Sequence, residues 1–288
     1  MKKITKAVIP VAGFGTRFLP FTKAVPKAML PVVNKPAIQV ITEEVVSSGI
    51  TDILFVVGYK SEVIKAHFSS SKILEEELLS KGKMEFYELV KQPESMAKIS
   101  FAVQEELNGT AKAVEVAKDF CNGEPFAVLF GDDLMYNPEK PVISQLIDAY
   151  YKTGKNVIGC KNVTREEVTK YASVEYSTKN DRLYDAVKIT EKPKLEDVNS
   201  TLSPLGRYVF TPDIFEAISS LKPAKNGEYQ LTDAYDLLAR DGKVCALEFE
   251  GERFDMGSRL GFLKANLNYA LIDKELSLEL KNYLKTLL

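Results

Sequence analysis

Short apolar runs of strand length alternate with segments of helical spacing, and this alternation most constrains the fold. The first run, residues 7–11, is apolar and rich in β-branched side chains, which is typical of a strand covered on both faces. Similar runs occupy 53–57, 126–130, 157–160, 173–176 and 205–210, and helical spacing occupies 38–48 and 111–120. The pattern predicts an α/β fold: a Rossmann-like mixed, mostly parallel sheet flanked by helices, with ligands beyond the carboxyl ends of its strands.

The second half of the chain follows a different pattern. After about residue 171 the alternation weakens and hairpin-like strands follow, which predicts an α+β extension that covers a second substrate. Residues 69–97 are polar and charged with helical patches, so we expect a helical excursion outside the core. Residues 260–288 are expected to form a pair of amphipathic helices. We expect a single domain over residues 1–288.

Charge and residue usage exclude several classes of function. The 38 Lys and Arg against 40 Asp and Glu leave a net charge of −2, which argues against nucleic acid or a membrane held by bulk charge. No apolar run reaches the length of a signal peptide or a membrane span, and the three cysteines lack metal or disulfide spacing, so we expect a cytoplasmic protein. The single histidine, His67, is expected to be a surface or packing residue. Together with the lack of a nucleophile turn, this argues against triad chemistry.

A glycine-rich turn, "GFGTR" at residues 13–17, follows the first strand. Gly13 and Gly15 expose backbone N–H groups, which attract anions. The turn lacks the third glycine of a dinucleotide fingerprint, and the chain has no Walker A spacing. Two interpretations remain open: a purely structural turn, or a phosphate cradle in which the planar donors of Arg17 suit a triphosphate.

Lys27 lies in "TKAVPKAMLPV", between Pro26 and Pro31, which stiffen the backbone around it. It is either an ordinary surface lysine or a second cation for the same phosphates as Arg17.

Carboxylates end two strand-like runs. Asp132 and Asp133 follow a buried strand in "VLFGDDLM", where they could hold Mg²⁺ or simply cap a turn. Asp255 in "RFDMGSR" is a candidate second ligand. In "EKP", a proline stiffens Glu191 and Lys192, which could bind substrate or form only a loop salt bridge.

Nine segments, in order, resemble the sugar nucleotidyltransferase family, and in particular the bacterial UTP–glucose-1-phosphate uridylyltransferases (UDP-glucose pyrophosphorylases). They are "IPVAGFGTRFLP", "PKAMLPV", "KPAIQ", "QEELNG", "GDD", "EKP", "GRYVFTPDIF", "GEYQLTDA" and "FDMGSRLGF". The resemblance implies Mg²⁺-assisted transfer of a uridylyl group from UTP to glucose 1-phosphate, and a dimeric or tetrameric homo-oligomer. Alternatives are a related enzyme that uses dTTP or another sugar phosphate, a non-catalytic nucleotide-sugar sensor, and, more remotely, an NAD-dependent dehydrogenase.

The resemblance also implies roles for individual residues. Catalytic cations would be Arg17, Lys27 and Lys192, and the Mg²⁺ ligands would be Asp132 and Asp255. Substrate-binding positions would be Ala12, Gly13, Gln104, Gly109, Asp132, Ala172, Glu191 and Gly206. On this basis, residues 1–170 would mainly bind nucleotide, residues 171–259 would mainly bind sugar phosphate, and residues 260–288 would be C-terminal helices.

The chain departs from the family pattern at three positions. Ala28 stands where relatives usually carry glutamate, Lys112 stands where they carry histidine, and Ala172 replaces a glycine. The added methyl group of Ala172 could crowd a sugar hydroxyl. The specificity for base and sugar therefore stays open at the level of sequence.

Overall fold

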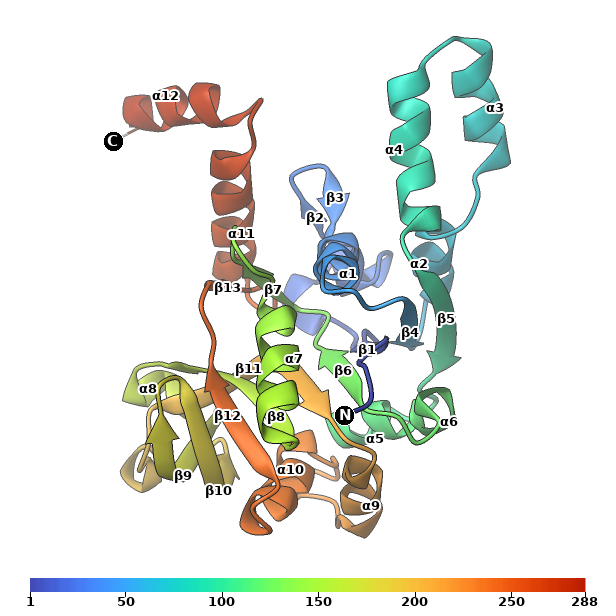
Figure 1. Cartoon of the computed structure of the whole chain (residues 1–288). Helices are drawn as coiled ribbons and strands as arrows, with labels where there is room; N and C mark the ends of the chain where they lie inside the picture. The colour runs from blue at the N-terminus through green and yellow to red at the C-terminus, as the bar shows by residue number, and fades with distance from the viewer. Residues whose placement is uncertain (288) are drawn as a thin grey trace.

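The computed structural model describes residues 1–287 and is built on one nine-stranded sheet, in the order β5-β4-β1-β6-β11-β8-β12-β10-β9 (Figure 1). β10 and β11 run against the other seven strands, so the sheet is mixed and mostly parallel, as predicted. The strands are β1 (Lys6–Pro10), β4 (Asp52–Val57), β5 (Lys98–Val103), β6 (Phe126–Leu129), β8 (Asn156–Asn162), β9 (Ala172–Asn180), β10 (Leu183–Glu191), β11 (Leu202–Phe210) and β12 (Val244–Glu248).

Helices cover both faces of this sheet and form two hydrophobic cores. Ile9 of β1 belongs to the core that contains α1 (Ala37–Ser47) and α7 (Val142–Thr153). Its neighbour Val8 points to the opposite core, formed with α5 (Thr110–Glu115), α6 (Lys118–Cys121), α9 (Asp213–Ser220) and α10 (Leu231–Arg240). Burial on both faces explains why β1 is apolar from Ala7 onward.

Two predictions of individual elements need correction. The helix expected over residues 111–120 is two short helices, because α5 ends at Glu115 and α6 begins at Lys118. The sequence analysis also missed β5 and β12. β5 is an edge strand with no fully buried residue, so it lacks the continuous apolar run by which the other strands were found.

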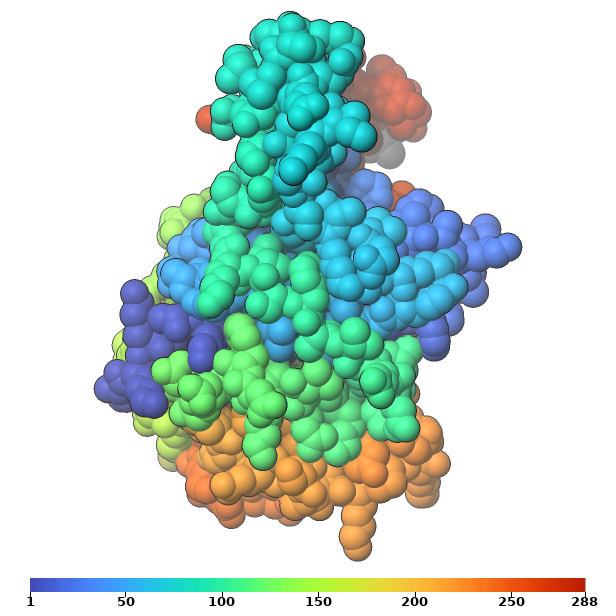
Figure 2. Space-filling view, turned by 90° about the vertical axis from the view of Figure 1, so that its right-hand side faces the viewer, coloured from blue at the N-terminus to red at the C-terminus, as the bar shows by residue number. Residues whose placement is uncertain are grey.

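Two pairs of helices extend from the body on the same side of the sheet (Figure 1). After α2 (Ser61–His67), a hairpin of α3 (Lys72–Ser80) and α4 (Met84–Ser95) projects as an arm that buries only Pro93 (Figure 2). At the other end of the chain, α11 (Arg259–Ile272) and α12 (Ser277–Leu287) bury only Ala265. The predicted helical excursion and C-terminal helices are confirmed as far as residue 287. Over this range, none of the helices is long and apolar enough to cross a membrane.

The remaining elements are short strands, one short helix and 3₁₀ turns outside the large sheet. The strands β7 (Asp133–Tyr136) and β13 (Glu252–Asp255) form an antiparallel ribbon in which Asp255 pairs with Asp133. The others are β2 (Pro31–Val32), β3 (Lys35–Pro36), α8 (Arg165–Val168), and four 3₁₀ turns, η1 (Thr16–Phe18), η2 (Phe21–Lys23), η3 (Lys27–Met29) and η4 (Leu195–Asp197).

An ion pair whose arginine is fully buried fixes the start of β7. The side chain of Arg207 has no solvent exposure, and its Nη2 lies 2.7 Å from Oε2 of Glu44 on α1. The same nitrogen donates to the carbonyl oxygen of Asp133 at 2.8 Å. Because a buried charge is tolerated only when it is paired, this contact ties β11, α1 and β7 together.

Candidate functional site

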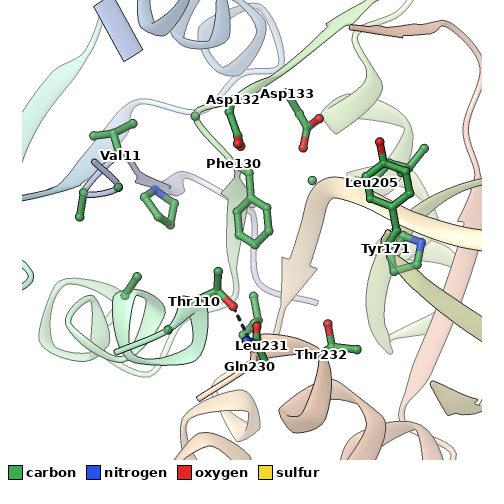
Figure 3. A pocket seen from close by; sticks show the side chains of 18 of the residues that line it. Val11, Thr110, Phe130, Asp132, Asp133, Tyr171, Leu205, Gln230, Leu231 and Thr232 are labelled. Carbon is green, nitrogen blue, oxygen red and sulfur yellow. Dashed lines mark hydrogen bonds between the residues drawn. The ribbon is translucent and has the colours of Figure 1, made fainter. Parts of the chain in front are cut away.

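A cleft of ≈ 480 Å³ lies where the chain leaves the carboxyl ends of β1, β5 and β6. Figure 3 shows Asp132 and Asp133 on one side of it and Thr110, Gln230, Leu231 and Thr232 on the opposite side. All of the site residues predicted from sequence line this one cleft: Ala12, Gly13, Arg17, Lys27, Gln104, Gly109, Asp132, Ala172, Glu191, Lys192, Gly206 and Asp255. The structure therefore brings both halves of the chain to a single site.

The glycine-rich turn after β1 packs directly on Lys27. Gly15 has a left-handed φ of 63°, and a Cβ atom built on it would lie 2.8 Å from Cβ of Lys27. Glycine is therefore required here both for backbone conformation and for space. Arg17 leaves the same turn, and its Nη1 donates to the carbonyl oxygen of Gly257 at 2.9 Å. Arg17 and Lys27, two of the three predicted cations, thus lie at the carboxylate side of the cleft.

The two consecutive aspartates after β6 have different environments. Nζ of Lys27 lies 2.6 Å from Oδ2 of Asp132, whose side chain is 42% exposed. Burial alone would raise the pKa of Asp132, but the Lys27 ammonium outweighs it, so this pKa lies below its ordinary value. Asp133 points inward, and burial raises its pKa to about 6 even though the Arg253 guanidinium opposes the shift. Asp132 is therefore the carboxylate that can face a ligand as an anion.

Asp255 reaches the site through the β7–β13 ribbon. A Cβ atom built on Gly257 would lie 2.6 Å from Oδ1 of Asp255 and 3.4 Å from Oδ2 of Asp132, so both carboxylates face the same small region. Within residues 1–287, no group of three or more His, Cys, Asp or Glu side chains could hold a metal ion. Mg²⁺ commonly takes only one or two protein carboxylates and completes its shell with phosphate and water. The donor set therefore fits Mg²⁺ bound together with a phosphorylated ligand.

The opposite side of the cleft is built around Gly109. Nε2 of Gln104 donates to the carbonyl oxygen of Gly109 at 3.2 Å. Tyr229 pairs with this segment: its N–H donates to Asn108 at 2.8 Å and its carbonyl oxygen accepts from Ala111 at 3.0 Å. Gly109 has a φ of 119°, and a Cβ atom there would lie 2.3 Å from the carbonyl oxygen of Tyr229. Only glycine allows these two segments to form a common wall.

The end of β10 supplies a carboxylate and a cation. Oε2 of Glu191 accepts from Thr232 at 2.7 Å, and Oε1 lies 3.3 Å from Nζ of Lys192. Lys192 adopts a left-handed φ of 41°, and its N–H donates to the carbonyl oxygen of Tyr171 at 2.6 Å. A non-glycine residue in this region is strained, so the surrounding contacts must hold it. The Lys192 side chain itself is 59% exposed and free to meet a ligand.

Ala172 and Gly206 line the same part of the cleft. Ala172 pairs with Glu191 across the β9–β10 hairpin, so its methyl group forms part of the wall beside that carboxylate. Gly206 has a φ of 66°, and a Cβ atom there would lie 2.3 Å from Oδ2 of Asp133. The absence of a side chain at residue 206 therefore leaves room for Asp133.

The sequence analysis assigned no role to four residues that line or support the cleft: Tyr171, Tyr229, Thr232 and Arg253. Two of them, Tyr229 and Thr232, lie in "GEYQLTDA". This segment was recognisable in the sequence, but the roles of its residues depend on contacts with positions far apart in the chain. Asp133, which was a candidate Mg²⁺ ligand or turn cap, pairs instead with Arg253. Cys121, Cys160 and Cys245 are all free and buried. Burial raises the pKa of the Cys121 thiol to about 12, which is unsuited to a nucleophile.

A family model described as nucleotidyl transferase matches residues 6–271. The chain belongs to the nucleotidyl transferase family. This nucleotidyl transferase is 45% identical over 287 residues to UTP–glucose-1-phosphate uridylyltransferase 2 of Staphylococcus saprophyticus, covering 100% of the chain and 99% of that relative. It is 45% identical over 288 residues to the UTP–glucose-1-phosphate uridylyltransferase of Bacillus subtilis, covering 100% of the chain and 98% of that relative.

Solved structures give the same result for the nucleotidyl transferase. A UDP-glucose pyrophosphorylase complexed with UDP-glucose superposes with a TM-score of 0.84 at 35% identity, covering 92% of this chain and 98% of that one. A UTP-bound UDP-glucose pyrophosphorylase from Acinetobacter baumannii superposes with a TM-score of 0.89 at 33% identity, covering 98% of both chains. The predicted fold and the predicted resemblance to this family are confirmed.

Proposed function

We infer that this nucleotidyl transferase transfers the uridylyl group of UTP to glucose 1-phosphate, producing UDP-glucose and pyrophosphate. The observation that carries this inference is the cleft itself, in which residues from eight of the nine matching segments, all but "KPAIQ", converge. It combines exposed cations from both halves of the chain with a pair of carboxylates, which is the composition needed to hold two phosphorylated substrates together. Full-length similarity to relatives named for this reaction supports the same conclusion.

The reaction needs no protein nucleophile. An anionic phosphate oxygen of glucose 1-phosphate attacks the α-phosphorus of UTP in line, and the bond to the departing pyrophosphate breaks. The barrier comes largely from bringing two polyanions together, so positioning and charge stabilisation are the main contributions of the protein. Arg17 and Lys27 would neutralise the triphosphate, and Lys192 would hold the sugar phosphate.

Other residues of the cleft would position the two substrates. Ala12 and Gly13 would approach the nucleotide through the turn after β1, while Gln104 and Gly109 would contact the base. Glu191 would bind sugar hydroxyls. Ala172 and Gly206 would line the hexose pocket beside it. This arrangement assigns residues 1–170 mainly to nucleotide and residues 171–259 mainly to sugar phosphate within one domain of 288 residues.

Mg²⁺ is the metal that the donor set fits, and Asp132 and Asp255 would hold it. When bound, the ion would neutralise charge on the reacting phosphates. Lys27 faces the same carboxylate and would keep Asp132 ionised and oriented.

Of the three positions that depart from the family pattern, Lys112 lies outside the cleft wall. Nζ of Lys112 lies 2.7 Å from Oε2 of Glu115 and 4.8 Å from the ring centroid of Tyr229, so it packs α5 against the Tyr229 segment. Ala28, in contrast, lines the cleft and is buried. Of the departures from the family pattern, Ala28 and Ala172 are therefore the positions that bear on the choice of substrate.

The test is pyrophosphate release with Mg²⁺ and glucose 1-phosphate, comparing UTP, dTTP, CTP, ATP and GTP in parallel, with a chelator control. Release that is fastest with UTP, and that yields UDP-glucose, would support the proposal. Faster release with dTTP would identify a thymidylyltransferase instead. Binding of UTP without release from glucose 1-phosphate would point to a different sugar phosphate or to a nucleotide sensor, and a panel of sugar 1-phosphates would separate the two.

We further propose a cytoplasmic homo-oligomer. Support comes from apolar side chains that stand exposed on the arm and the C-terminal helices: Ile73, Phe86, Leu89, Leu260, Leu263 and Leu278. The molar mass in solution, measured by light scattering against the 32.1 kDa monomer, tests the oligomeric state.

A further inference from the structure

Arg253 forms a bridge across the cleft that the reaction scheme above does not use. Its Nε and Nη2 each lie 2.6 Å from Oδ1 of Asp133, and its Nη1 donates to the hydroxyl oxygen of Tyr171 at 2.9 Å. The guanidinium carbon also lies 4.7 Å from the centroid of the Tyr171 ring. Only 15% of the Arg253 side chain is exposed. The guanidinium is thus held on two sides by protein groups.

Tyr171 continues the connection to the sugar-phosphate side of the cleft. Its backbone carbonyl accepts the Lys192 N–H at 2.6 Å, and this contact supports the left-handed backbone of Lys192. A single residue therefore contacts Arg253 through its side chain and Lys192 through its main chain. The continuous path runs from Asp133, next to Asp132, through Arg253 and Tyr171 to Lys192.

We propose that Arg253 and Tyr171 are positioning residues that set the distance between the Asp132 carboxylate and the Lys192 ammonium. The proposal rests on the proposed function, in which Asp132 and Lys192 serve the nucleotide and the sugar phosphate respectively. In-line attack requires the two phosphates to meet within a narrow range of distance and angle, and small displacements are costly. Each of the three Arg253 nitrogens contacts Asp133 or Tyr171, so we assign Arg253 a role that acts through these two neighbours.

The experiment uses two conservative variants of the full chain and their combination. Tyr171→Phe removes the hydroxyl that meets Arg253 and keeps the ring. Arg253→Lys keeps a positive charge near Asp133 but cannot make the forked contact. Tyr176→Phe is the matched control, because Tyr176 lies on β9, the strand that begins directly after Tyr171, is 43% exposed, and makes no side-chain hydrogen bond within the described part of the chain.

We expect Tyr171→Phe and Arg253→Lys each to raise the KM for glucose 1-phosphate by about tenfold, the scale of one lost hydrogen bond to a charged group. The KM for UTP should stay within about twofold of the parental value. The double variant should have a KM for glucose 1-phosphate close to that of the more affected single variant, because both substitutions remove the same contact. The affinity for UDP-glucose, measured by calorimetry, should fall in the same variants. This measurement does not depend on turnover. Tyr176→Phe should match the parent in all three measurements.

Three outcomes would overturn the proposal: parental KM values in Tyr171→Phe, effects of the two single variants that multiply in the double variant, or equal changes for UTP and glucose 1-phosphate. The activity of the unsubstituted parent protein distinguishes a failure of the positioning role from a failure of the proposed function. If the parent makes no UDP-glucose, the proposed function is wrong and the positioning role is lost with it. If the parent is active while Tyr171→Phe behaves like Tyr176→Phe, only the positioning role is wrong.

Discussion

The ammonium nitrogen of Lys27 lies 2.6 Å from Oδ2 of Asp132, although 105 positions separate the two residues. The contact joins the 3₁₀ turn η3, which begins at Lys27, to the carboxyl end of β6. Prolines on each side of η3 hold Lys27 in place, and the sheet to which β6 belongs holds Asp132. The fold thus holds a cation and a carboxylate together, and preorganisation of this kind reduces the reorganisation that a reaction requires.

Replacing Lys27 by alanine should lower turnover by roughly 10²-fold or more, the scale seen when a positioned electrostatic stabiliser is lost. The measurement is the rate of pyrophosphate release at saturating UTP, glucose 1-phosphate and Mg²⁺. Lys23→Ala is the control, because Lys23 is an exposed lysine on the neighbouring turn η2 and lies outside the cleft. Near-normal turnover in a folded Lys27→Ala protein would refute the assigned role.

Asp255→Asn should raise the Mg²⁺ concentration for half-maximal activity by about tenfold, because a neutral amide is a weaker ligand for a hard cation. The asparagine Oδ1 can still accept the Gly257 N–H, so the fold should be retained. A Mg²⁺ titration of activity at fixed substrate checks this. Asp241→Asn serves as the control, since that side chain is 65% exposed and distant from the cleft. An unchanged titration midpoint in Asp255→Asn would exclude Asp255 as a ligand.

Gly109→Ala should lower the Tm by about 5 °C or more, because the new methyl group would collide with the Tyr229 backbone as well as strain a positive φ. Gly49→Ala separates the two causes. Gly49 also has a positive φ, of 81°, but a Cβ atom there meets nothing within 4 Å. Thermal melts of both variants give the comparison. A Gly109→Ala protein that melts no lower than Gly49→Ala would argue against a rigid wall at Tyr229.

His67 should titrate with a pKa below 6.5, because its partial burial disfavours the charged imidazolium. Nε2 lies 2.9 Å from Oε1 of Gln39. The unfolded chain takes up this proton at higher pH than the folded one, so the His67 contribution to stability is complete above about pH 6.5 and declines as the pH falls below it. Because the chain has one histidine, NMR of a single imidazole resonance measures the pKa directly. A value at or above 6.5 would contradict the structure.

Local patterns were sufficient to predict much of the fold and the charged residues of the cleft. The positions Ala12, Gln104, Gly109, Ala172 and Gly206 came only from the family resemblance. The apolar runs located β1, β4 and β6, and residues at their carboxyl ends were correctly expected to meet, because parallel strands end on one edge. The β5 strand was not found, because its residues are only partly buried and leave no clear pattern. The break between α5 and α6 depends on how Val116 and Ala117 pack, and spacing alone does not contain that information.

Residues that act through a partner were harder to predict. Arg253 is adjacent to "FDMG" and carries no distinctive pattern of its own. Its significance depends on Asp133, which lies 120 positions away, and on Tyr171, which lies 82 positions away. The register of β7 against β13 brings Arg253 beside Asp133, and the loop before β9 brings Tyr171 to the same guanidinium. Pairing of distant segments is a property of the whole fold, and a single sequence does not reveal it.

The β7–β13 ribbon also determines when, during synthesis of the chain, the carboxylate pair of the cleft can form. Asp132 and Asp133 are synthesised well before Asp255, and the partner strand begins only at Glu252. A nascent chain that has emerged through β11 already possesses β1, β4, β5 and β6 but only one side of its carboxylate pair. The acidic pair is completed only when β13 docks on β7, so the proposed metal site cannot form until the chain has been synthesised beyond Asp255.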